Sequence, residues 1–131
     1  MVKIKTKVLV CCSKGLNRSK YLAEYLRRKG YSTKFGGIEG WQSERRKWNP
    51  ISQDMVDWAD IIVSVRPRLS GTLKKKFKVG KKKIISLDVS DSKRVLPKEF
   101  DELRKLDFRT FNRKWTRPQL RKAIKPYLPL N

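Results

Sequence analysis

Five residues separate Cys12 from Arg18 near the start of the sequence, and Ser19 follows the arginine directly. A cysteine thiolate is a nucleophile, and a guanidinium can bind two oxygens of a phosphoryl group at once. Ser19 can donate a hydrogen bond to the sulfur. The candidate phosphate-binding residues are Arg18 and the five before it: Ser13, Lys14, Gly15, Leu16 and Asn17. This spacing predicts attack of Cys12 on phosphorus while Arg18 holds the phosphoryl oxygens.

The elements on either side of this stretch would position it. Residues 8–11 are an apolar run, as expected of a central parallel strand buried on both faces. From residue 21 to residue 26, apolar side chains recur at helical spacing, and Gly30 ends the pattern. A loop between a strand end and a helix start presents backbone N–H groups and partial positive charge. We therefore expect this loop to bind an anion and to stabilise Cys12 as a thiolate.

The rest of the chain alternates between strand and helix patterns. We expect strands at 31–35, 61–65 and 84–87, and helices from Ser52, from Pro67, near Pro97 and from Pro118 to Tyr127. This order predicts an α/β fold, an open four-stranded parallel sheet of flavodoxin-like order 2-1-3-4 with helices on both faces. Residues 1–108 would form this domain. Residues 109–131 would be a basic helical extension packed on the domain or trailing from it.

Phosphate-ester hydrolysis also requires an acid that protonates the leaving group. Asp88 closes the fourth predicted strand, at the sheet edge where the Cys12 loop should lie, and is the favoured candidate. Asp91, three residues later, is the alternative. The predicted substrate cleft includes Arg66, which follows the third strand, and the tryptophans Trp41 and Trp48 in the loop after the second. These two tryptophans could equally pack over the sheet.

Composition excludes several kinds of chemistry. The 131 residues include no histidine, which excludes Ser-His-Asp triads, Cys-His dyads and nearly every zinc centre. The net charge of +22 favours anionic partners, so nucleic acid or another polyanion, a phosphoprotein and an anionic membrane surface all stay open. The lysine-rich run 74–83 fits a solvated face better than a nucleic-acid site. No apolar run could span a membrane, and the two adjacent cysteines suggest a reducing cytoplasm.

The sequence resembles the low-molecular-weight protein tyrosine phosphatases, in particular their small prokaryotic members. The resemblance covers about residues 5–107 and rests on three segments: VLVCCSKGLNRSKYLAEYL, NPISQDMVDWADIIVSVRPRL and IISLDVSDSKRVLPKEFDELRKL. It implies Cys12 as nucleophile, Arg18 as phosphate clamp, Ser19 as thiolate partner and Asp88 as general acid, with no metal and no cofactor. The family's usual Asp-Pro-Tyr-Tyr acid loop is absent. The implied activity is hydrolysis of phosphoprotein (tyrosine) esters through a phosphocysteine intermediate.

Three other functions share parts of this pattern. The main rival is a phosphatase-like fold whose chief task is to bind nucleic acid or a phosphoprotein. An arsenate reductase would need further cysteines to carry oxidising equivalents, and the chain has only Cys11 besides Cys12. A phosphotransfer domain would preserve its phosphocysteine, whereas the Arg18-Ser19 pair suits turnover better.

Overall fold

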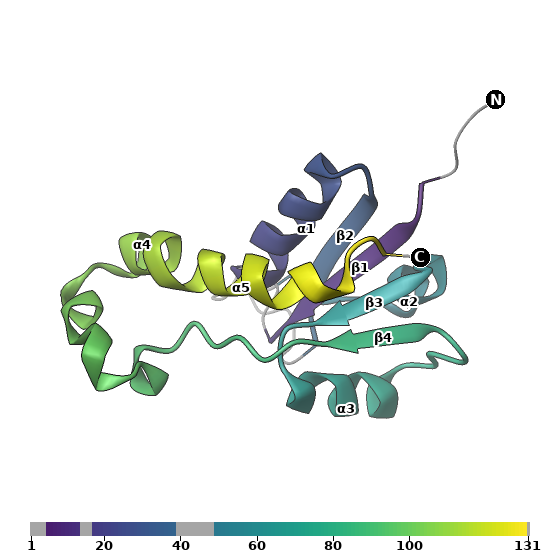
Figure 1. The fold of residues 1–131 in the computed structure, drawn as a ribbon. Coiled ribbons are helices and arrows are strands. Elements are labelled where there is room, and N and C mark those ends of the chain that lie inside the picture. The colour runs from purple at the N-terminus through teal and green to yellow at the C-terminus, as the bar shows by residue number, and fades with distance from the viewer. Residues whose placement is uncertain (1–4, 14–16, 39–48, 131) are drawn as a thin grey trace.

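The protein is an open four-stranded parallel sheet covered by helices (Figure 1). This computed structural model describes residues 5–13, 17–38 and 49–130. The strands are β1 (Lys7–Cys12), β2 (Ser32–Gly37), β3 (Ile61–Ser64) and β4 (Lys83–Ser86). They lie in the order β2-β1-β3-β4, all parallel, which confirms the predicted α/β fold and its 2-1-3-4 strand order.

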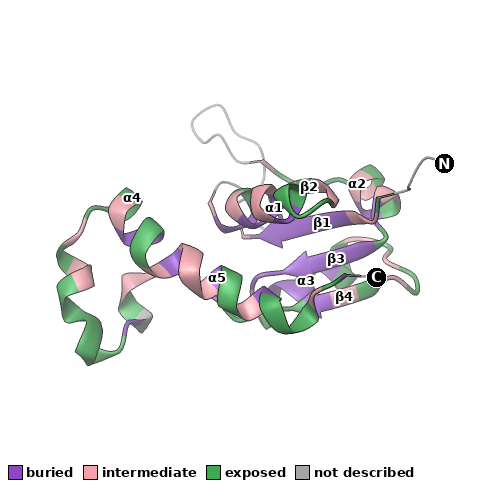
Figure 2. Cartoon of the chain, turned by 45° about the horizontal axis from the view of Figure 1, so that its top comes forward, coloured by how far each residue is buried: buried purple, intermediate pink, exposed green. Residues whose placement is uncertain are grey.

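The helices α1 (Arg18–Arg28), α2 (Gln53–Trp58) and α3 (Pro67–Lys76) connect these strands. Strand β2 lies on one side of β1, whereas β3 and β4 lie on the other. Because parallel crossovers are right-handed, α1 and α3 cover opposite faces of the sheet. The central strands β1 and β3 are therefore enclosed, and Figure 2 shows both coloured as buried.

Local sequence signals explain where these helices begin and end. The Ser52 hydroxyl caps α2 by accepting a hydrogen bond from the Met55 backbone N–H at 3.3 Å. Pro67 occupies the first turn of α3, where its missing N–H removes no helical hydrogen bond. Gly30 follows α1 with φ +106°, a backbone conformation that favours glycine. The expected starts at Ser52 and Pro67 and the stop at Gly30 are thus confirmed.

Strand β2 extends past its predicted end. The predicted strand stopped at residue 35, but β2 continues through Gly36 and Gly37. The segment after the next loop crosses this point closely, because a Cβ on Gly36 would lie 2.5 Å from Cγ2 of Ile51. The Gly37 N–H also donates to the Asn49 carbonyl at 2.7 Å. These glycines therefore permit a close backbone approach and do not mark a turn.

The C-terminal helix begins earlier than predicted. It consists of α4 (Phe108–Phe111), a π-helical turn (Asn112–Thr116), α5 (Arg117–Ile124) and the 3₁₀ turn η4 (Lys125–Tyr127). The predicted start at Pro118 was wrong. A proline inside an α-helix has no N–H to donate and collides with the preceding turn, and here the wider π-helical turn comes just before it. The helix can therefore run through Pro118.

The extension packs against the domain through α5. Leu120 and Ile124 are fully buried, belong to the same core as the sheet, and lie on a helix that contacts α1. Leu130 is also buried, and its backbone N–H donates to the Tyr31 hydroxyl at 2.7 Å. Among the described residues, no helix combines the length and the hydrophobicity needed to cross a membrane.

The helix predicted near Pro97 is not an α-helix. After the short 3₁₀ turn η1 (Lys93–Val95), the chain forms 3₁₀ turns, η2 (Lys98–Lys105), that are interrupted at Phe100 by φ −109° and ψ 21°. Segment η2 has no buried residue. The Phe100 ring instead contacts the Trp115 ring, with centroids 4.9 Å apart. Without a face packed on the core, this segment lacks the burial that stabilises most protein helices.

Candidate active site

Cys12 lies at the carboxyl end of β1, directly before the predicted phosphate loop. It is 3% exposed, and its Sγ lies 3.1 Å from the hydroxyl oxygen of Ser19, which is fully buried in the first turn of α1. When the sulfur is a thiolate, this hydroxyl can donate to it. The structure therefore brings the predicted nucleophile and its predicted partner together, at the start of an 11-residue helix whose dipole favours negative charge.

The Arg18 guanidinium is fixed from three sides. Its Nη1 donates to the Val89 carbonyl at 2.8 Å, and its Nη2 donates to the Ser13 hydroxyl at 3.4 Å. Its Nε forms an ion pair with Asp91 at 3.5 Å. Only 7% of the residue is exposed. An arginine held in this way offers a preorganised fork of donors to an anion in the loop.

Asn17, the last residue of the predicted loop, connects it to two distant segments. The Asn17 amide nitrogen donates to the Asp91 carboxylate at 3.0 Å and to the Asn112 side-chain oxygen at 3.1 Å. Asn112 is 4% exposed and begins the π-helical turn. We call Asn17, Asp91 and Asn112 the amide link. It attaches Asn17, directly before α1, to the C-terminal helix.

The two candidate acids occupy different surroundings. The Asp88 side chain is 73% exposed and pairs with Arg66, whose Nε lies 3.1 Å from its carboxylate. The Asp91 side chain is 27% exposed and contacts the loop through Arg18 and Asn17. Asp88 and Arg66 line a surface hollow of about 290 Å³ with Val89, Ser90, Trp115 and Gln119. This hollow borders the site, because the Val89 carbonyl also holds Arg18.

Cys11 differs sharply from its neighbour. It is fully buried within β1, and burial raises the pKa of its thiol far above the ordinary value of 9.0, with a smaller contribution from the charge of Cys12. A thiol in this environment stays protonated and inert. Cys11 is therefore a small core residue of β1.

Several predicted residues lie outside the described part of the chain: Lys14, Gly15, Leu16, Trp41 and Trp48.

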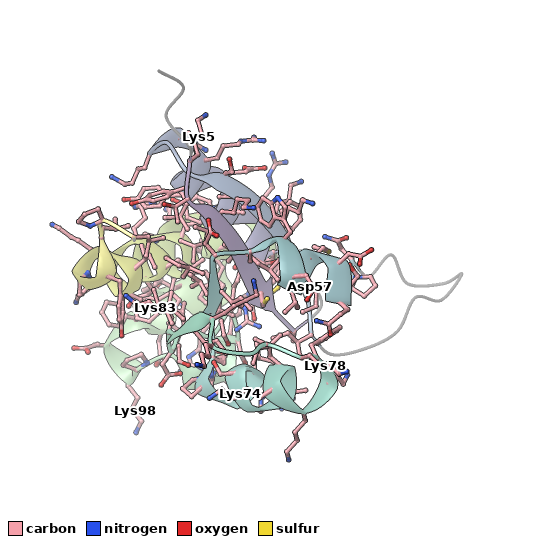
Figure 3. All side chains as sticks on the ribbon, turned by 90° about the vertical axis from the view of Figure 1, so that its right-hand side faces the viewer. Lys5, Asp57, Lys74, Lys78, Lys83 and Lys98 are labelled. Carbon is pink, nitrogen blue, oxygen red and sulfur yellow. The ribbon has the colours of Figure 1, made fainter. Side chains whose placement is uncertain are left out.

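The lysine-rich run is described and solvent-facing. Lys74, Lys78 and Lys83 are exposed, and Figure 3 shows them spread around the α3–β4 side of the protein. Their exposure agrees with the interpretation of this run as a solvated face.

The sequence did not point to three residues of the C-terminal helix that belong to the site: Asn112, Trp115 and Gln119. A four-residue periodicity nevertheless indicates that the C-terminal helix begins early enough to include them. Residues 112, 116, 120 and 124 are all buried and recur every four residues, so one buried helical face extends well before Pro118. Asn112 and Thr116 are the polar members of that face, and a polar residue on a buried helical face suggests a specific hydrogen bond.

The same fold occurs in solved phosphatases. The low-molecular-weight protein tyrosine phosphatase from Streptococcus pyogenes matches with a TM-score of 0.59 and 12% identity, over 94% of this chain and 91% of that one. The YwlE arginine phosphatase from Geobacillus stearothermophilus matches with a TM-score of 0.58 and 16% identity, over 96% of this chain and 97% of that one. The low-molecular-weight protein tyrosine phosphatase from T. tengcongensis matches with a TM-score of 0.56 and 14% identity, over 93% of this chain and 99% of that one.

At these identities the likeness concerns the fold. The chain has the fold of the low-molecular-weight protein tyrosine phosphatases, as the sequence resemblance implied. No protein-family model matches the sequence, and no curated protein does.

Proposed function

We propose that this protein is a cysteine-dependent phosphatase that hydrolyses phosphate monoesters of proteins. The observation that carries the proposal is the position of Cys12, whose sulfur lies 3.1 Å from Ser19 at the start of α1, directly after the buried Arg18 in the sequence. The thiolate would attack phosphorus, and the ester oxygen would leave with a proton. Water would then hydrolyse the phosphocysteine. Arg18 would stabilise the charge on the equatorial oxygens.

We assign different roles to the two aspartates. Asp88 is the proposed general acid, because its largely exposed carboxylate borders an open hollow where a leaving group could lie. Asp91 is the proposed positioning residue, because it already contacts Arg18 and Asn17 at the loop. Asp88 would first protonate the leaving ester oxygen. It would then activate the water that hydrolyses the phosphocysteine.

The proposed substrate is a phosphotyrosyl protein. The names of the similar structures include both tyrosine and arginine phosphatases. In this chain, the hollow beside Asp88 is lined by Arg66 and by the Trp115 side chain. An indole can pack against a phenol ring, whereas a nearby arginine and a net charge of +22 disfavour a guanidinium leaving group.

Hydrolysis of p-nitrophenyl phosphate in EDTA tests the activity. We expect turnover by the reduced wild type and none by Cys12→Ser. The matched variant Cys11→Ser should keep its turnover, because Cys11 is buried away from the loop. Absence of turnover in reduced wild type between about pH 5 and 7 would contradict the proposal.

Substrates with different leaving groups distinguish the roles of the two aspartates. p-Nitrophenolate leaves readily without a proton, whereas an alkoxide does not. Asp88→Asn should therefore slow hydrolysis of an alkyl phosphate much more than that of p-nitrophenyl phosphate. Asp91→Asn should slow both by a similar factor, because it acts through Arg18 and Asn17. The opposite pattern would exchange the two assignments.

The alternative function is a phosphatase-like binding module. The supporting observation is the net charge of +22, which exceeds what binding one phosphate requires. A module would bind a polyanion equally well after Cys12→Ser and would show no turnover as wild type. The phosphatase proposal instead requires that wild-type protein hydrolyses p-nitrophenyl phosphate.

A further inference from the structure

The C-terminal helix carries arginines around one surface hollow. Arg109, Arg113 and Arg117 follow at four-residue intervals and line it together with Thr110. Residues four apart lie on the same face of a helix, so these guanidinium groups repel one another. The residues described as lining this hollow include no carboxylate. An anionic partner would therefore relieve a repulsion that the described lining does not offset.

A second hollow continues this basic surface to the phosphate loop. It shares Arg117 with the first hollow and is also lined by Lys20, Arg28 and Glu24 of α1 and by Asn17 of the loop. Helix α5 packs on α1 in this region, and Figure 1 shows the α4–α5 stretch crossing α1. We call the two hollows together the arginine groove. It runs from Arg109 on the C-terminal helix to Asn17, directly before Arg18.

The arginine groove is also lined by Tyr21, and three neighbouring side chains already contact this residue. The Arg117 guanidinium lies 5.1 Å from the centre of the Tyr21 ring, and Tyr25 stacks on this ring with centroids 6.4 Å apart. The Tyr21 hydroxyl accepts a hydrogen bond from Arg121 at 2.6 Å. Proteins that bind single-stranded nucleic acids need aromatic faces on which bases stack. Because Tyr21 is covered in this way, the groove suits an acidic polypeptide better than a single-stranded nucleic acid.

From these observations we infer that the arginine groove docks an acidic segment of the phosphorylated protein substrate, next to the residue that enters the phosphate loop. This inference rests on the proposed phosphatase function. Arg109 and Arg117 are eight residues apart, so they are at most about 12 Å apart along the helix axis, the length of eight α-helical residues. That distance corresponds to roughly four residues of extended polypeptide. The preferred substrate would therefore carry a short run of aspartate, glutamate or phosphorylated residues close to its phosphotyrosine.

Paired peptides test the groove. One phosphotyrosyl peptide carries four flanking glutamates, and its partner carries glutamines in the same places. For wild type we expect a higher kcat/KM for the acidic peptide, mainly through a lower KM, and a loss of this preference at high salt. In the double variant Arg109→Gln, Arg113→Gln, the ratio of the two kcat/KM values should fall about 2- to 30-fold, as expected for two exposed ion contacts.

The matched control removes the same charge elsewhere. Lys74 and Lys75 are exposed on the far end of α3 and line neither hollow. The double variant Lys74→Gln, Lys75→Gln should keep the wild-type preference for the acidic peptide. An equal loss in both double variants would mean that net charge attracts the peptide and would overturn the groove. Equal kcat/KM for both peptides with wild-type protein would also overturn it.

A binding experiment separates the groove from the chemistry. With Cys12→Ser protein, fluorescence anisotropy can compare the acidic phosphopeptide with a single-stranded oligonucleotide of equal charge. Tighter binding of the peptide, weakened by the Arg109→Gln, Arg113→Gln changes, supports the inference. Tighter binding of the oligonucleotide with the same sensitivity would make the groove a nucleic-acid site. If the peptide binds but wild type does not hydrolyse p-nitrophenyl phosphate, the phosphatase proposal is refuted. The arginine groove would then be an anion-binding site without the proposed chemistry.

Discussion

Replacing Asn112 by alanine removes one end of the amide link. Asn17 would then lose the acceptor that lies 3.1 Å from its amide nitrogen, in a part-buried setting. Leaving such a donor unpaired costs about 1–3 kcal/mol. If the loop must recover this free energy to reach its catalytic shape, kcat/KM for p-nitrophenyl phosphate should fall about 5- to 150-fold. Asn112 contacts the loop and not the reacting atoms, so it would act as a positioning residue.

The same helix provides a matched control. Thr116 is 1% exposed on the same π-helical turn, and its hydroxyl has no hydrogen-bond partner among the described residues. Thr116→Val should therefore keep both the fold and the activity. Circular dichroism and urea unfolding would verify that each variant is folded under the assay conditions. An equal loss of kcat/KM in Thr116→Val would show that any change in this helix disturbs the site.

A double-mutant cycle tests the link itself. If Asn17 and Asn112 act through their shared hydrogen bond, the Asn17→Ala, Asn112→Ala protein should be little worse than Asn17→Ala alone. The coupling free energy should lie within about 0.5–3 kcal/mol, the range for residues in direct contact. Additive losses in kcat/KM would refute the argument, because the two residues would then influence turnover independently.

Three further substitutions test the packing. Gly36→Ala should lower the free energy of unfolding by more than about 1 kcal/mol, because its Cβ would lie 2.5 Å from Ile51, and urea unfolding would measure the loss. Gly71→Ala, at an exposed position of α3, should raise it by about 0.5–1 kcal/mol, since nothing beyond the local helix backbone lies within 4 Å of the new Cβ. The raised pKa of Cys11 means that the unfolded chain loses this proton above pH 9.0 while the folded chain keeps it. Wild type should therefore lose stability relative to Cys11→Ala by up to about 1.4 kcal/mol per pH unit above that point, and parallel stability curves would contradict this.

The sequence predicted the sheet well because its central strands, β1 and β3, are buried on both faces. The run at residues 8–11 is wholly apolar and includes the β-branched Val8 and Val10, as expected of a buried parallel strand. The position of Cys12 and Arg18 at a strand end and a helix start followed directly from it. The capped start at Ser52 and the stop at Gly30 were predictable for a related reason, because capping and positive φ depend on local residues.

The amide link could not be predicted in the same way. Asn17 and Asn112 are 95 residues apart, and nothing local to either residue identifies the other. Pro118 moreover indicated a helix start, because the usual rule places proline in the first turn. Only the π-helical turn before it shows that the helix continues toward Phe108. Likewise, the helix predicted near Pro97 is absent, because this segment buries no residue and its Phe100 packs on Trp115.

The amide link also bears on how the protein acquires activity during synthesis. Ribosomes add about 5–20 residues per second, and the N-terminal part of a chain can begin to fold first. The 95 residues between Asn17 and Asn112 therefore correspond to roughly 5–19 seconds of translation. During this interval the emerging chain would already carry its nucleophile, but not the helix that holds the phosphate loop. On the proposed phosphatase function, a nascent chain should thus have little activity until the C-terminal helix docks.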